Sequence, residues 1–164
     1  MTKESILEQI QNLGCSLVQV TGGEPLDQLK VPDLLTVLAD QGFKVLLETG
    51  GHRSIESVDP RIHLNMDLKC PGSKMSKKNL LSNLEWLKIT DDLKFVIQDH
   101  QDFDWAEKMI EEHSLANRAN LWFSPVYGIL KEEELANWIL ESPHTIRMQV
   151  QLHKSIWGPE TTGV

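Results

Sequence analysis

The sequence is short of cysteine, of long apolar runs and of positive charge, and each shortage excludes a class of protein. Two cysteines, Cys15 and Cys70, occur in 164 residues. They are too few for a disulfide framework, or for a metal site with four cysteine ligands in one chain, so we expect two reduced thiols. Apolar runs such as Val45-Leu46-Leu47 are far shorter than the roughly 20 residues of a membrane-spanning helix. The first residues also lack the apolar segment of a signal peptide.

The charge balance is acidic, with 16 Lys and Arg against 24 Asp and Glu and a net charge of −8. Neutralising the phosphates of nucleic acids needs clustered positive side chains, so this balance argues against a nucleic-acid-binding surface. A local basic pocket for a small anionic substrate stays open. Together, these shortages predict a cytoplasmic protein that binds neither nucleic acid nor a membrane.

Short apolar strands alternate with amphipathic helices along the chain. The segment 63–69 alternates most cleanly, with Leu64, Met66 and Leu68 on one face. Strands are predicted over 15–20, 43–49, 63–69, 92–97, 121–126 and 145–153. Helices are predicted over 2–13, 32–42, 77–86, 102–116 with Asp102 as its N-cap, and 131–141, followed by an irregular tail over 154–164. This order predicts one α/β domain over 1–164, with a mostly parallel sheet and outer helices.

Polar side chains recur on one face of several of these strands, although buried parallel strands are usually apolar on both faces. A solvent-facing edge would explain one such strand, but the recurrence favours an open barrel with a polar interior. The usual ligand-binding end of such a fold lies at the carboxyl ends of the strands. The polar residues are Gln19, Thr21, Glu48, Asn65, Asp67, Lys69, Arg147, Gln149, Gln151 and His153.

The loop Thr21-Gly22-Gly23-Glu24-Pro25 follows a predicted strand. Two glycines let the backbone approach a ligand closely, and the glutamate offers an acceptor for an ammonium group. A tight turn without a ligand is the alternative. A phosphate-binding loop is a third interpretation, but neither of its usual glycine spacings is present.

This loop resembles the Gly-Gly-Glu-Pro turn with which radical S-adenosylmethionine (SAM) enzymes contact the methionyl part of their cofactor. Further segments resemble one family of those enzymes, the 7-carboxy-7-deazaguanine synthases, and the resemblance covers nearly everything from Leu17 onward. These segments are Asp67-Leu68-Lys69-Cys70-Pro71 with Ser73, Lys94-Phe95-Val96-Ile97, Phe123-Ser124-Pro125-Val126 with Gly128, and the run from Arg147 to Lys154 with Ile156-Trp157-Gly158.

The resemblance implies roles for individual residues. Thr21, Gly22, Gly23 and Glu24 would line the amino-acid end of SAM. Glu48 and Thr49 match the family's Glu-Thr at the next strand end, where Gly50 replaces the usual serine. Lys69 and Ser73 would lie beside the cofactor's carboxylate or ribose, Gln149 and His153 would contact a pterin substrate, and Lys154 would lie near the substrate carboxylate.

The resemblance also implies an incomplete (βα) barrel and an activity. The family converts 6-carboxy-5,6,7,8-tetrahydropterin to 7-carboxy-7-deazaguanine by a SAM-dependent radical ring contraction, a carbon–nitrogen lyase step in queuosine and 7-deazapurine biosynthesis. Its members use a [4Fe–4S] cluster and Mg²⁺ and take electrons from a reductant such as flavodoxin. A chain without the family's first strand would have an unpaired strand edge, so we expect this one to form homodimers or to aggregate. The cluster is held by three cysteines in the loop after the family's first strand, followed by a magnesium-binding threonine.

Neither that cysteine motif nor that threonine occurs in this sequence, so we expect no metal ligand in it. The expected unit is a radical SAM-like domain without the first strand and cluster loop, inactive as this chain alone. A fragment, a degenerate module that binds SAM or pterin without turnover, and a chain completed by a separate polypeptide are the three explanations. A glycyl-radical-enzyme activase, which carries the same Gly-Gly-Glu-Pro turn, is the alternative enzyme.

Overall fold

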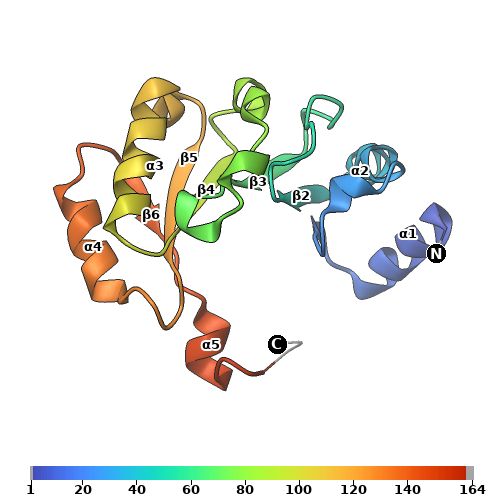
Figure 1. Cartoon of the computed structure of the whole chain (residues 1–164). Coiled ribbons are helices and arrows are strands. Elements are labelled where there is room, and N and C mark those ends of the chain that lie inside the picture. The colour runs from blue at the N-terminus through green and yellow to red at the C-terminus, as the bar shows by residue number, and fades with distance from the viewer. Residues whose placement is uncertain (1, 162–164) are drawn as a thin grey trace.

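All six strands run parallel and lie side by side in chain order. The computed structural model describes residues 2–161. The strands are β1 (Leu17–Val20), β2 (Lys44–Thr49), β3 (His63–Asp67), β4 (Asp92–Ile97), β5 (Asn120–Pro125) and β6 (Ile146–Met148). The helices are α1 (Lys3–Leu13), α2 (Val31–Asp40), α3 (His100–Glu112), α4 (Glu132–Glu141) and α5 (Leu152–Trp157). Within this part of the chain β1 and β6 form two open edges, so the predicted α/β incomplete barrel is confirmed (Figure 1).

The two faces of the sheet differ because alternate side chains of each strand point to opposite sides. On the convex face, apolar side chains of β2 to β5 are buried under α2, α3 and α4, which Figure 1 shows along the outside of the arch. Phe95 and Phe123 are fully buried there, and their rings pack edge to face at 5.2 Å. Burying such aromatic side chains stabilises the fold by about 1.5–3 kcal/mol each.

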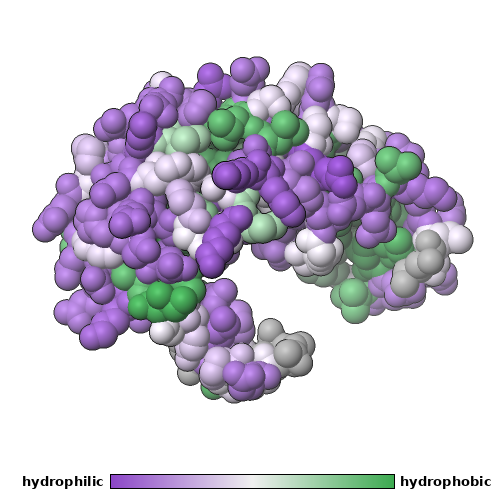
Figure 2. Space-filling model, in the orientation of Figure 1, coloured by the Kyte–Doolittle hydropathy of each residue, from purple (hydrophilic) through white to green (hydrophobic). Residues whose placement is uncertain are grey.

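Among residues 2–161, no layer of helices covers the concave face as α2, α3 and α4 cover the convex face. Half-buried polar residues of β2, β3 and β4 point to the concave face, as the alternating pattern predicts. Figure 2 shows the hollow inner side of the arch, with hydrophilic side chains reaching into it and α5 at its lower rim. None of the helices in residues 2–161 has the length and apolarity needed to cross a bilayer.

The last predicted strand is too long. Strand β6 ends at Met148, and α5 takes residues that were predicted to be strand and irregular tail. Its neighbour β5 ends at Pro125, which has no N–H to donate to a ladder. The N–H of Gln149 still bonds to the Phe123 carbonyl. Beyond Gln149 the backbone therefore leaves the sheet and forms local hydrogen bonds.

The helix predicted between β3 and β4 is also wrong, because two short 3₁₀ turns, η3 (Ser76–Lys78) and η4 (Leu81–Trp86), take its place. The side chain of Asn79 bonds to both the N–H and the carbonyl of Lys69. The buried Asn83 bonds to three backbone groups of the loop before β3. Such side-chain bonds to distant backbone compete with a regular helix.

Helix α3 begins three residues before its predicted start. The N-cap is Asp99, whose carboxylate accepts from the N–H of Asp102 at 3.0 Å. Asp102 is itself buried and accepts from the N–H groups of Gly72 (2.8 Å) and Gln98 (3.1 Å). It therefore ties α3 to the turn that follows β3.

Candidate functional site

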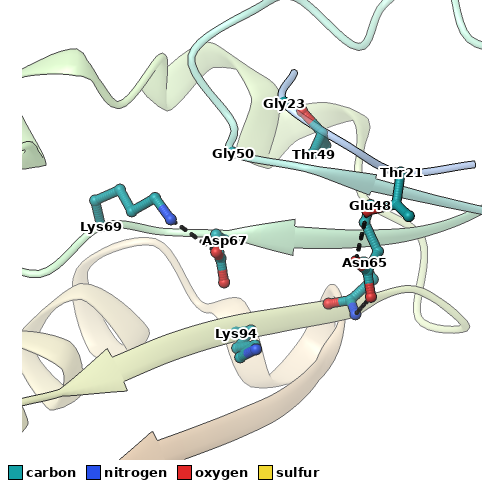
Figure 3. A pocket seen from close by; sticks show the side chains of 9 residues that line it. All are labelled: Thr21, Gly23, Glu48, Thr49, Gly50, Asn65, Asp67, Lys69 and Lys94. Carbon is teal, nitrogen blue, oxygen red and sulfur yellow. Dashed lines mark hydrogen bonds and ion pairs between the residues drawn. The ribbon is translucent and has the colours of Figure 1, made fainter. Parts of the chain in front are cut away.

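A polar hollow of about 170 Å³ opens on the concave face, near the carboxyl ends of the first strands (Figure 3). We call it the central hollow. It brings together five of the residues that the sequence predicted for the cofactor, namely Thr21, Gly23, Glu48, Thr49 and Lys69. The other lining residues are Gly50, Asn65, Asp67 and Lys94.

Glu48 is the hydrogen-bonding centre of one wall of this hollow. It accepts from Thr21 Oγ1 at 2.9 Å and from Asn65 Nδ2 at 3.4 Å, so its side chain joins the ends of β1, β2 and β3. A carboxylate has about four lone-pair positions, and these two bonds leave acceptor capacity for a ligand. Glu48 is therefore suited to bind an ammonium or amino group.

Glu24 lies behind the hollow and braces it. Its side chain is only 5% exposed and accepts from Thr49 Oγ1 at 2.9 Å, from the N–H of Gly50 at 2.8 Å and from the N–H of Leu26 at 3.1 Å. The sequence predicted an acceptor for a ligand ammonium at this position. In the structure the carboxylate fastens the loop after β1 to the end of β2.

The two glycines of that loop have backbone angles that favour glycine. Gly22 has φ +101° and Gly23 has φ +59°, and side-chain-bearing residues adopt such angles at a cost of about 1–2 kcal/mol. Of the two, only Gly23 lines the hollow. Their backbone angles thus fit the tight turn that the sequence left open as the alternative interpretation.

The predicted cofactor residues Lys69 and Ser73 differ in their placement. Lys69 lines the hollow, where its Nζ lies 2.7 Å from Asp67 Oδ2. Ser73 does not line it: its Oγ donates to the Cys70 carbonyl at 2.6 Å and accepts from the N–H of Met75. Ser73 thus shapes the turn after β3.

A second hollow of about 400 Å³ adjoins the first on the side of β6, and we call it the β6 hollow. Gln149 and His153, two of the residues predicted to contact a substrate, line it. The third, Lys154, lies outside its lining, with Nζ over the Tyr127 ring at 4.9 Å. Glu48 and Lys94 line both hollows. The remaining lining residues are Ser124, Val150, Gln151 and Leu152.

Lys94 was not among the predicted site residues. The signal for it was available, because β4 alternates and places Asp92, Lys94 and Val96 on the same face as the polar residues of β3. However, a single lysine on a strand with alternating apolar residues can be either solvated or ligand-binding, and the sequence pattern alone does not distinguish the two.

The two cysteines do not fit an iron–sulfur cluster. Cys70 is buried, and this burial, followed by the nearby carboxylates of Asp102 and Asp67, raises the pKa of its thiol. Cys15 is exposed, near the start of β1. Within residues 2–161 no three Cys, His, Asp or Glu side chains are grouped so that they could hold a metal ion.

This difference predicts selective alkylation. Iodoacetamide at pH 8 should modify Cys15 and spare Cys70 in the folded protein, because the thiolate is the reacting form and burial disfavours it. Mass spectrometry of peptides should find both residues modified after unfolding in urea. Modification of Cys70 in the folded protein as fast as that of Cys15 would contradict the burial described above.

Comparison with known proteins identifies the family, although no protein-family model matches the chain. The 7-carboxy-7-deazaguanine synthase of Chlorobaculum tepidum is 38% identical over 168 residues, which cover all of this chain and 76% of the relative. The synthase of Koribacter versatilis is 36% identical, covering all of this chain and 79% of its own length. The chain belongs to the 7-carboxy-7-deazaguanine synthase family.

The fold of this synthase family member agrees with a solved structure. The crystal structure of QueE from Escherichia coli matches with a TM-score of 0.72, covering 91% of this chain and 64% of that one. Only 18% of the residues are identical, so this likeness concerns the fold alone. The resemblance drawn from the sequence motifs is confirmed by the sequence relatives.

Proposed function

We propose that this synthase family member binds SAM in the central hollow and 6-carboxy-5,6,7,8-tetrahydropterin in the β6 hollow, as a radical SAM carbon–nitrogen lyase that forms 7-carboxy-7-deazaguanine. The observation that carries the proposal is that the two hollows adjoin and share Glu48 and Lys94. Two ligands bound there would meet between β2 and β4. We place the reaction in the cytoplasm, as a step of queuosine and 7-deazapurine biosynthesis.

The central hollow suits the amino-acid end of SAM. The Glu48 carboxylate would accept a hydrogen bond from the ammonium group of SAM. Thr21 would hold the Glu48 side chain in place through its 2.9 Å hydrogen bond. Thr49 and Gly50 are held at the hollow by Glu24. Their backbone can therefore contact the cofactor without a large rearrangement.

The β6 hollow suits a flat, polar heterocycle. The Gln149 side chain offers both an amide N–H and a carbonyl oxygen, which match the alternating donors and acceptors of a pterin edge. His153 lies on α5, at the rim of the same hollow. Its ring can donate or accept a hydrogen bond, depending on the tautomer.

The described residues do not supply ligands for the [4Fe–4S] cluster or for Mg²⁺. We therefore assign to this chain the binding and orientation of SAM and the pterin, whereas the ring contraction depends on the cofactor chemistry. Turnover would require cysteines beyond these two, and a reductant such as flavodoxin. We also propose a homodimer, which the open edge of β1 and the exposed Leu13 and Leu17 next to it support.

Binding measured by calorimetry tests the proposal without requiring turnover. We expect the protein to bind SAM, and to bind the stable oxidised analogue 6-carboxypterin. Glu48→Ala should weaken SAM binding about tenfold or more, because it removes the acceptor that faces the central hollow. Binding of SAM without any affinity for the pterin would contradict the proposed substrate site in the β6 hollow.

A further inference from the structure

Lys94 lies in the middle of the concave face, between the two hollows. It is on β4, in register with Asp67 of β3 and Trp122 of β5. Figure 3 shows it across β3 from Glu48, which shares both hollows with it. A group held at Lys94 is therefore accessible from both hollows.

Both register neighbours of Lys94 are already engaged. The Asp67 carboxylate forms an ion pair with Lys69 Nζ at 2.7 Å, and the indole N–H of Trp122 donates to Asp92 at 2.8 Å. Among residues 2–161, the ammonium group of Lys94 has no hydrogen-bond acceptor and no ion-pair partner. Partial burial of an ammonium group without a partner is unfavourable in free energy, because the group loses hydration. An anion bound beside it offsets this loss through a charge-assisted hydrogen bond.

The other cations near the hollows are less available. Lys69 is neutralised by Asp67, and the guanidinium of Arg147 lies over the Trp122 ring at 5.4 Å. Lys154 is outside the lining of both hollows. A carboxylate that entered either hollow would thus be attracted most strongly to the ammonium group of Lys94, which no other charged group among the described residues neutralises.

We infer that Lys94 binds a ligand carboxylate at the junction of the two hollows, in place of the role that the sequence suggested for Lys69 or Lys154. This inference rests on the proposed function, because SAM and 6-carboxy-5,6,7,8-tetrahydropterin each carry one carboxylate. A charge-assisted hydrogen bond in a partly buried site changes affinity about ten- to a hundredfold. Lys94 is in this way a determinant of specificity for carboxylated ligands.

The test pairs each ligand with an analogue that lacks the carboxylate: SAM with decarboxylated SAM, and 6-carboxypterin with pterin. Lys94→Met keeps the aliphatic stem and removes the charge, and should weaken one carboxylated ligand about ten- to a hundredfold. The matching decarboxylated analogue should change less than about threefold, since its binding does not use the charge. Lys94→Arg should restore most of the affinity.

Lys108→Met, on the exposed side of α3, is the control for removing a lysine. Near-ultraviolet circular dichroism verifies that each variant is folded. A loss confined to SAM assigns the carboxylate to the cofactor, and a loss confined to 6-carboxypterin assigns it to the substrate.

Four outcomes count against the inference. Unchanged affinities in Lys94→Met, or equal losses for a ligand and its decarboxylated analogue, would overturn it while the proposed function stands. A specific loss in Lys154→Met, with Lys94→Met unaffected, would overturn it as well. A wild-type protein that binds neither SAM nor 6-carboxypterin would overturn the proposed function, and this inference with it.

Discussion

Replacing Asp91 by alanine is expected to lower the free energy of unfolding by about 2–5 kcal/mol, because it leaves two backbone N–H groups without their acceptor and removes the buried partner of the half-exposed Lys88. Asp91 is fully buried at the amino-terminal ends of the central strands. Its carboxylate accepts from the N–H of Leu64 at 3.0 Å and from the N–H of Lys88 at 2.9 Å. Lys88 Nζ is 3.0 Å from the same carboxylate.

The backbone of Asp91 contributes a further connection, because its carbonyl accepts from the N–H of Asn120 at 2.8 Å. One residue thus joins β3, β4 and β5 at the end of the sheet opposite the hollows. Urea denaturation measures the effect, with Asp104→Ala on the exposed side of α3 as the control, expected within about 1 kcal/mol. A loss for Asp91→Ala no larger than for this control would show that the buried contacts are not needed.

Replacing Glu24 by alanine is expected to lower the free energy of unfolding by about 2–4 kcal/mol and to weaken SAM binding at the same time. The substitution leaves Thr49 Oγ1 and the N–H of Gly50 without their acceptor behind the central hollow. It also frees the loop after β1 from the end of β2. The loop carries Gly23 and the strand end carries Thr49, so these two walls of the hollow would no longer be held at a fixed distance from each other.

The Glu24 variant separates two roles for this residue. Denaturant unfolding and SAM calorimetry on Glu24→Ala and Glu24→Gln should show stability and affinity falling together, with a smaller loss for glutamine, whose carbonyl oxygen still accepts. Glu56→Ala, at an exposed position, controls for the loss of a surface carboxylate. Unchanged stability with a selective loss of SAM binding would instead make Glu24 a direct ligand of the cofactor, as the sequence motif suggested.

The residue pattern was sufficient for the order of the strands, for the bounds of the central ones and for the polar face. Strand β4 has the predicted bounds, and β3 differs only in ending two residues earlier, at Asp67. Alternation is a local property that follows from the geometry of a strand, so it can be read without knowing the neighbours. The same reasoning brought Thr21, Glu48 and Lys69 to one end of the sheet, where the structure has them.

The turns between strands were predicted less well. The chain between β3 and β4 has helix-compatible residues, but the side chain of Asn83 bonds to backbone that lies about 30 residues earlier. Likewise, Asp102 looked like an N-cap in the sequence, and is instead the buried acceptor for Gly72. Hydrogen bonds between distant segments are decided by packing, which local propensity does not contain.

The sequence by itself determined that this chain is an α/β protein of the synthase family, which residues face the concave side, and which motif follows β1. Only the tertiary structure decided how the charges on that side are distributed. Lys69 and Lys94 are both lysines on polar faces, yet Asp67 pairs with one and leaves the other without an acceptor among residues 2–161. Pairing requires atoms within about 3–4 Å, and such distances depend on how neighbouring strands are aligned.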